Sequence, residues 1–194
     1  ADVKRFDPNK DIFNPDKLIN ESAAWATYNK DDSIFYDCLE RIDEKEKARL
    51  IELITNKKNS FNSLLFAKLI FLKNIRSLSE TNNESLYEIA RNLQTVNLNK
   101  IGDTQIFEEE LTGFVSAGSL DFSYGTDTQN VNIGGVFGSL FSTAYNKSTI
   151  VAIAKDTVCY TISNSIIYQL ITKEPNLIEL LYSPVLQESE LTTI

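Results

Sequence analysis

Residues 114–133 read FVSAGSLDFSYGTDTQNVNI, and this stretch decides the fold. Two short turns, Ala117-Gly118 and Gly125-Thr126, divide it into segments that are rich in aromatic and β-branched residues. Segments of this kind, bounded by glycine, are typical of β-strands joined by tight turns. Several short strands at such close spacing favour a β-roll or barrel over an open sheet.

Short segments with strand-like composition continue on both sides of this stretch, and two predicted helices follow them at the end of the chain. We expect an α+β fold: an antiparallel β-roll, jelly-roll-like, flanked by helices and preceded by a helical subdomain. The further predicted strands are Thr95–Leu98, Gln105–Phe107, Thr149–Ala154 and Val158–Ile162, and the closing helices are Asn164–Leu170 and Pro175–Leu181.

Ahead of the roll, apolar residues recur at helical spacing from Asp16 to about Asn74. We expect three or four short helices, with Ser60 capping the last of them and Trp25 partly buried. Another helix is predicted over Ser79–Leu93 with Ser79 as its cap. The predicted division is a helical region at 1–68, either HEAT-like or a linker, and a roll domain at 69–194.

The charge balance disfavours nucleic acid as a partner. Nineteen basic residues stand against 27 acidic ones, a net charge of −8, which opposes the counterion-release attraction on which nucleic-acid binding depends. No stretch approaches the roughly 18 apolar residues of a membrane helix, so we expect a soluble chain. Two cysteines without companions fit a reducing compartment, so we expect a cytoplasmic location. The chain contains no methionine, and we expect it to be a piece of a longer protein.

The chain has no histidine, which removes the commonest general base and the commonest neutral metal ligand. A hydroxyl-rich run that includes Ser139, Ser142 and Thr143 offers no base to activate a serine, so we expect no enzyme activity. A cupin-type metal site needs histidines and is excluded on the same ground. Cys38 and Cys159 are read as two buried thiols rather than a disulfide.

The order of these segments resembles the cyclic nucleotide-binding domains of catabolite activator proteins, kinase regulatory subunits and gated channels. The resemblance runs from about Leu69 to Leu181. It is carried by the hairpin Val115–Leu120, by Gly135–Leu140, by Ser148–Ala152 and by Asp156–Ile162. It implies a ligand-binding β-roll that acts as a regulatory or ligand-sensing module.

The resemblance also implies where a ligand would lie. In that family the Phe-Gly pair is followed by a glutamate that binds the ribose, and an arginine eight to ten residues on holds the cyclic phosphate. Here the glutamate position is Ser139, and the arginine position falls on Asn146 or Lys147. Losing two charged partners should weaken binding by several powers of ten. The candidate binding residues are Phe137, Gly138, Ser139, Leu140, Asn146, Lys147, Ser148 and Thr149.

We therefore expect no tightly held cofactor, and only weak or lost binding of a cyclic nucleotide such as cAMP. The expected partner is a small anionic or nucleotide ligand, and a homo-oligomer is compatible with the sequence. The alternative is a pure interaction module. Residues 22–28 and the helices after them resemble the HEAT-like helices of bacterial transporter-like membrane proteins. In that reading the chain is the cytoplasmic part, linked to the membrane only through a missing part.

Overall fold

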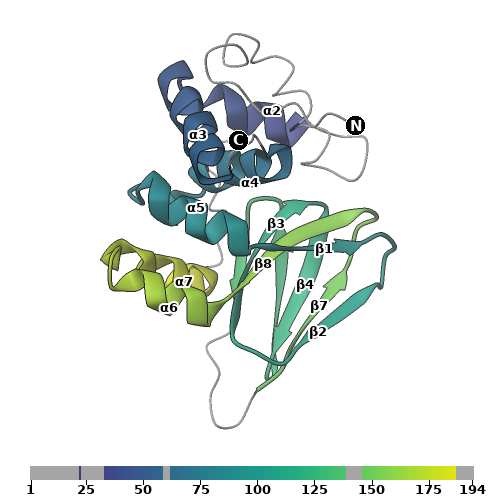
Figure 1. The fold of residues 1–194 in the computed structure, drawn as a ribbon. Helices are drawn as coiled ribbons and strands as arrows, with labels where there is room; N and C mark the ends of the chain where they lie inside the picture. The colour runs from purple at the N-terminus through teal and green to yellow at the C-terminus, as the bar shows by residue number, and fades with distance from the viewer. Residues whose placement is uncertain (1–21, 23–32, 59–61, 139–145, 187–194) are drawn as a thin grey trace.

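The computed structural model describes residue 22 and residues 33–58, 62–138 and 146–186 (Figure 1). The predictions for Trp25, Ser60, Ser139 and Leu140 lie outside these residues. The helical front consists of α2 (Ser33–Glu40), α3 (Glu44–Lys58), α4 (Ser63–Lys73), the short 3-10 helix η2 (Arg76–Leu78) and α5 (Asn83–Asn92).

Two antiparallel sheets of four strands each form the roll. One has the order β1-β8-β3-β6 and the other has the order β2-β7-β4-β5. The strands are β1 (Gln94–Leu98), β2 (Thr104–Phe107), β3 (Leu111–Ala117), β4 (Ser119–Tyr124), β5 (Asp127–Asn132), β6 (Val136–Gly138), β7 (Ser148–Ala152) and β8 (Thr157–Ser163). After β8 come α6 (Asn164–Ile171), the 3-10 helix η3 (Pro175–Leu177) and α7 (Ile178–Leu186).

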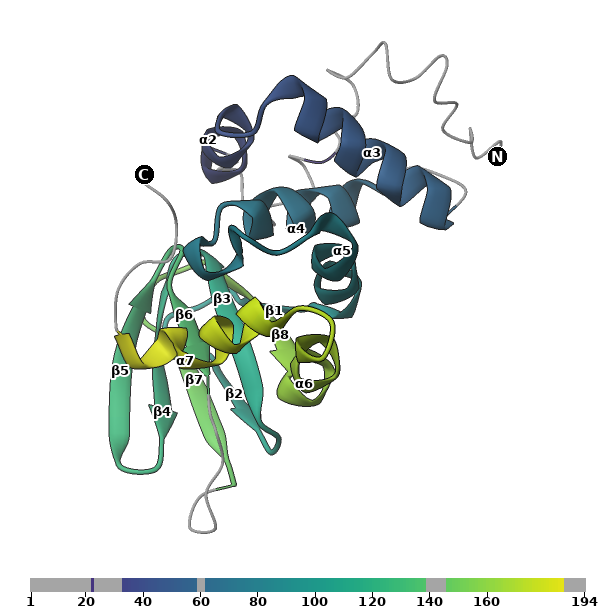
Figure 2. The same ribbon diagram turned by 90° about the vertical axis from the view of Figure 1, so that its left-hand side faces the viewer.

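The α+β fold class predicted from sequence is confirmed, down to the two turns of the central stretch. Gly118 joins β3 to β4 with φ +76°, and Gly125 joins β4 to β5 with φ +63°. Both angles lie in the left-handed region that glycine adopts without a Cβ penalty. Figure 2 shows β4 and β5 as the resulting long hairpin.

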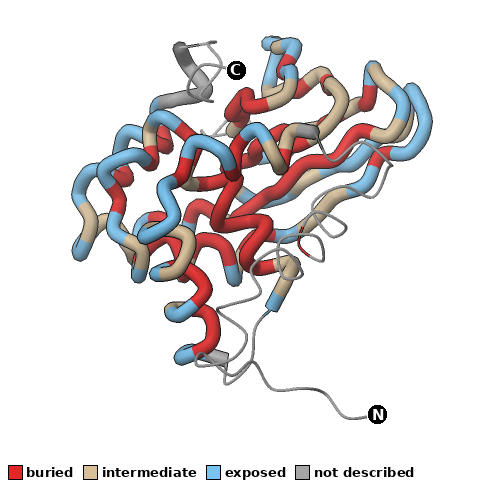
Figure 3. Tube along the Cα trace, turned by 90° about the horizontal axis from the view of Figure 1, so that it is seen from above, coloured by how far each residue is buried: buried red, intermediate tan, exposed pale blue. Residues whose placement is uncertain are grey.

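Two hydrophobic cores hold the molecule together. The smaller core lies inside the roll between the two sheets and includes Val115, Phe122, Phe137 and Ile150. The larger core lies between the helices and the outer face of the β1-β8-β3-β6 sheet. In the burial view the buried residues form a continuous band through the centre of the molecule (Figure 3).

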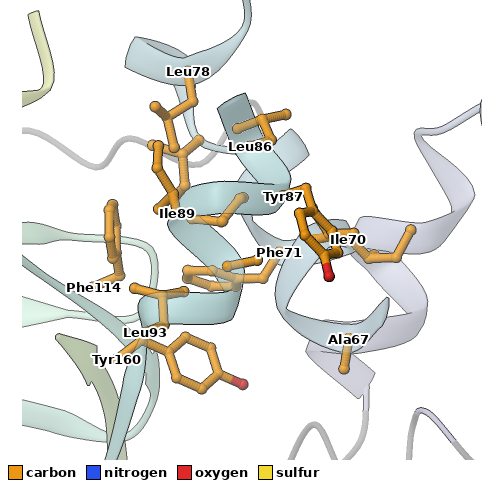
Figure 4. Close-up of a cluster of buried hydrophobic side chains, with 14 of the residues drawn as sticks. Ala67, Ile70, Phe71, Leu78, Leu86, Tyr87, Ile89, Leu93, Phe114 and Tyr160 are labelled. Atoms are coloured by element: carbon orange, nitrogen blue, oxygen red, sulfur yellow. The ribbon is translucent and has the colours of Figure 1, made fainter. Parts of the chain in front are cut away.

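Helix α4 is the centre of the larger core because it is apolar on nearly every side. Its residues from Leu65 to Leu72 are all buried. Phe71 projects from α4 toward the sheet (Figure 4), where its ring meets Phe114 at 6.4 Å and Tyr160 at 5.7 Å in edge-on geometry. Contacts of this kind add about 0.5–1.5 kcal/mol each beyond area burial. They fix the helical front on the roll.

One predicted helix start is wrong. Ser79 does not cap α5, because that role belongs to Asn82, whose side chain accepts a hydrogen bond from the Ser85 amide at 2.9 Å. Ser79 instead ends the 3-10 turn η2, which places Leu78 in the core with no exposed surface. The last predicted helix also divides in two, since Pro175 begins a 3-10 turn before α7.

The predicted division at residue 68 falls inside α4, which runs without interruption from Ser63 to Lys73. The assignment of two domains stays a prediction. The cysteine reading is confirmed, since Cys38 and Cys159 are both free and buried. In the part of the chain that the structure describes, no helix is long and apolar enough to cross a membrane.

Candidate functional site

The first predicted site residues, Phe137 and Gly138, form the end of β6 and pair with β3. Gly138 lies opposite Thr112, and Phe137 lies opposite Gly113. The Phe137 ring is fully buried inside the roll, where it packs against Phe122 with 5.2 Å between ring centroids. A Cβ at Gly113 would collide with this ring, so the glycine provides the space that the ring occupies.

We call the predicted site residues, 137–140 and 146–149, the cassette. Asn146 and Lys147 are exposed directly before β7. The Lys147 ammonium lies 3.4 Å from a carboxylate oxygen of Glu108, and both side chains are mostly exposed. An exposed pair of this kind contributes about 0–1 kcal/mol, so it constrains the lysine only weakly. It nevertheless places a carboxylate beside the one cation of the predicted cassette.

Ser148 is the most distinctive of the described cassette residues. Its side chain is 1% exposed, and its hydroxyl has no hydrogen-bond partner among the residues that the structure describes. A buried hydroxyl without a partner costs roughly 1–3 kcal/mol. Natural proteins rarely keep such a group without a water, an ion or a ligand to satisfy it.

Two aromatic residues flank Ser148 across the sheet. Phe107 on β2 and Tyr124 on β4 both lie directly opposite Ser148 in the strand registers. Residues paired in this way project from the same face of the sheet, and both rings pack against the core inside the roll. The Phe107 ring, the Ser148 hydroxyl and the Tyr124 phenol therefore form a row across β2, β7 and β4.

Thr149 projects the other way. As the next residue along β7 it points to the opposite face of the sheet, where its register partners are Ile106 and Ser123. Ile106 is 58% exposed, so this is the outer surface of the roll. The structure therefore brings Phe137 and Ser148 to the inside of the roll and places Thr149 outside.

Sequence reasoning missed Phe107 and Tyr124 as neighbours of the cassette. Alternation along one strand does not say which residues of other strands lie opposite, so the sequence alone did not place these two rings beside Ser148. A register prediction for β2, β7 and β4 would have found them. The described residues contain no group of three or more histidine, cysteine or acidic side chains that could hold a metal ion.

The two cysteines are unsuited to reactive chemistry. Cys159 lies inside the roll opposite Val96 and Val115. Burial raises the pKa of its thiol to about 12, and burial likewise raises that of Cys38 to about 11. Because the thiolate is the reactive form, neither sulfur is suited to nucleophilic chemistry at neutral pH.

Comparisons with solved structures find several similar chains. A cyclic nucleotide-binding protein from Geobacter metallireducens is 18% identical with a TM-score of 0.45, over 59% of this chain and 89% of that one. The regulatory subunit of a cAMP-independent protein kinase A from Trypanosoma brucei is 20% identical with a TM-score of 0.47, over 70% and 53%. The N-terminal domain of a transcriptional regulator from Streptomyces coelicolor is 16% identical with a TM-score of 0.42, over 60% and 90%.

A protein of the class that the sequence resembles is thus among the solved structures that match this chain. No protein-family model matches the chain, and no curated protein sequence matches it. The chain spans about half the length of the kinase regulatory subunit. Identities of this size indicate a similar fold alone.

Proposed function

We propose that this chain is a non-enzymatic regulatory module that senses a small ligand inside the β-roll and binds cyclic nucleotides weakly or not at all. The observation that carries the proposal is the buried Ser148 hydroxyl, which has no partner among the described residues and lies between Phe107 and Tyr124. A hydroxyl and two aromatic rings at the edge of a core suit a small ligand with an apolar body and one polar group.

The weakness of cyclic nucleotide binding follows from charge. The cation of the cassette is Lys147, which lacks the rigid donor fork with which arginine grips a phosphate. Glu108 lies beside Lys147 and would repel an incoming phosphate. Neutral hydroxyl bonds contribute only about 0.5–1.5 kcal/mol each, against about 1.5–3 for charged ones. Ser148 therefore cannot replace the missing arginine.

A second candidate function, a pure interaction module, is favoured by one other observation. Three isoleucines are exposed near the β2 edge of the roll: Ile101 is 70% exposed, Ile106 58% and Ile153 42%. The backbone joins two of these segments, since the Gly102 amide donates to the Ala152 carbonyl at 2.8 Å. Exposed apolar residues that gather in this way are typical of a protein contact.

An NMR titration with cAMP and cGMP tests the proposal. We expect weak, millimolar binding whose shift changes concentrate on Phe107, Ser148 and Tyr124, and loss of those changes in Ser148→Val. Micromolar affinity would show that the cassette is intact and the weak-binding statement wrong. No change with either nucleotide would agree with lost cyclic nucleotide binding, and the same three residues would then be followed with other small ligands.

A gain-of-function variant adds a second test. The double substitution Ser139→Glu with Asn146→Arg restores the two residue types that the family resemblance implies. We expect it to strengthen cAMP binding measurably over the wild-type chain. The control Glu52→Asp with Lys155→Arg, two exposed positions away from the cassette that also leave the net charge unchanged, should leave cAMP binding unchanged.

A further inference from the structure

A cleft lies on the helical side of the molecule, between α4 and α5. It has a volume of about 170 Å³ and is lined by Asn62, Leu64, Leu65, Lys68, Ala90 and Arg91. That volume is more than ten times the roughly 10–15 Å³ that a single water needs. None of the cassette residues lines this cleft, so it is distinct from the site described above.

Lys68 is the unusual member of the lining because it is a lysine in an almost entirely apolar helix. Its side chain is 7% exposed, and desolvation by burial lowers its pKa. Lysine is almost never fully buried unless it is paired with an opposite charge. No carboxylate of the described residues forms an ion pair with it.

The contacts of Lys68 satisfy only part of its ammonium group. It donates one hydrogen bond to the Leu93 carbonyl at 2.9 Å and lies 5.7 Å from the Tyr160 ring centroid. The two contact residues, Leu93 and Tyr160, are labelled in Figure 4. An ammonium carries three donors, and a carbonyl with a ring does not neutralise its charge.

The other lining residues divide into an apolar wall and a polar rim. Leu65 and Ala90 are buried and Leu64 is half-buried, whereas Asn62 and Arg91 are exposed. Asn62 caps α4: its side-chain oxygen accepts a hydrogen bond from the Leu65 backbone amide at 2.9 Å. The side-chain NH₂ group of Asn62 is a hydrogen-bond donor. The positive end of the α4 dipole lies at this rim and favours an anion there.

We propose that this cleft binds a small aliphatic carboxylate, with its charged head on Lys68 and its chain against Leu64, Leu65 and Ala90. The carboxylate supplies the counter-charge that Lys68 lacks among the described residues. The three aliphatic side chains match a short hydrocarbon tail and offer no polar group to a sugar or a base. Arg91 at the rim, paired with Glu88 at 2.6 Å, adds a second cation near the entrance.

A purely structural role for Lys68 is the competing explanation. In that view the ammonium serves only to bind the carbonyl of Leu93, the residue that ends α5, where a cation is favoured by the helix dipole. The two explanations differ in one measurable respect. A structural lysine gives no saturable, localised response to a carboxylate, whereas a binding lysine does.

The experiment is an NMR titration of the whole chain with sodium butyrate, compared with sodium chloride at equal ionic strength. We expect saturable shift changes at the amides of Leu64, Ala90 and Arg91, and no such response to 1-butanol, which has the tail without the charge. Lys68→Gln should weaken butyrate binding about ten- to hundredfold. Lys155→Gln, with the same change of net charge at an exposed turn, should leave it unchanged.

A second variant covers the case in which Lys68→Gln fails to fold. Leu64→Trp keeps the lysine but fills the cleft, and it should abolish the butyrate response in a folded protein. The proposal is overturned if the wild-type chain shows no saturable change with butyrate, or if Leu64→Trp still binds it. Equal binding of inorganic phosphate would contradict the assigned ligand class.

Discussion

Thr112 on β3 donates a 2.7 Å hydrogen bond to the side-chain oxygen of Asn164, 52 residues later at the start of α6, and both side chains are buried. The same helix start is held again where the Asn164 amide donates to the Glu110 carbonyl at 3.0 Å. One turn further on, the Tyr168 hydroxyl donates to the Glu110 carboxylate at 2.7 Å. The closing helix is therefore fixed to the beginning of β3 at three points.

Thr112→Val tests the first of these points. The substitution keeps the shape of the side chain but removes the donor to Asn164, and we expect the free energy of unfolding to fall by about 1–3 kcal/mol. Urea denaturation measures it. Ser123→Ala is the control, because its hydroxyl makes its 3.0 Å contact with Thr128 at an exposed site. A loss no larger than the control's would mean that the buried bond is unimportant.

The strands were predictable because their signals are local. Alternating apolar residues and the left-handed turn at Gly118 mark β3 and β4 whatever they pack against. The start of α5 was not predictable from the sequence, because Ser79 and Asn82 are both good cap residues. In the structure the helix begins after Asn82, and the 3-10 turn before it carries Leu78, which is buried in the core.

The candidate site was predictable only in part. The Phe137-Gly138 pair and Ser148 could be found by resemblance along the chain. The row formed by Phe107, Ser148 and Tyr124 depends on the pairing of three strands that are far apart in sequence. Lys68 gave no local signal either, because a lysine within a helical stretch ordinarily lies on the solvent-facing side.

Glu46 joins three helices, and this makes a prediction about pH. Its carboxylate on α3 accepts from Asn83 at 2.7 Å and lies 3.0 Å from the Lys73 ammonium. Burial acts to raise its pKa, but these hydrogen bonds, the Lys73 charge and a bond from Arg49 outweigh it and lower the pKa from 4.5. The folded state therefore binds the proton less readily than the unfolded chain.

A lowered pKa stabilises the fold above the unfolded value and loses that contribution as pH falls through the folded value. Glu46→Gln should therefore be less stable than the wild-type chain at neutral pH, and the two should converge as the pH falls below the lowered pKa of Glu46. Urea midpoints across this range measure the difference. Glu44→Gln is the control. The Glu44 side chain is 85% exposed in its ion pair with Lys47, so we expect a smaller effect on stability. A constant gap between wild type and Glu46→Gln would contradict the argument.

Gly118→Ala should destabilise the roll for two separate reasons. A left-handed backbone costs a non-glycine residue about 1–2 kcal/mol. A Cβ at this position would also lie 2.8 Å from the Thr157 Cα, a backbone atom that cannot move aside alone. Gly102→Ala is a matched control, with φ +94° but nothing within 4 Å. In thermal denaturation Gly118→Ala should lose clearly more stability than Gly102→Ala, and equal losses would show that the contact relaxes.

Ser148→Ala is the most direct test of the buried hydroxyl. Ser148 and Ser116 are both buried strand serines, but the Ser116 hydroxyl donates to the Val158 carbonyl at 3.2 Å, whereas that of Ser148 has no partner among the described residues. Removing a satisfied hydroxyl should cost about 0.5–1.5 kcal/mol, and removing an unsatisfied one should cost nothing or stabilise the fold. We therefore expect Ser116→Ala to lower the free energy of unfolding in urea, and Ser148→Ala to leave it unchanged or raise it. If Ser148→Ala costs as much as Ser116→Ala, the hydroxyl is already bonded in the free protein. It would then be a structural group rather than one that awaits a ligand.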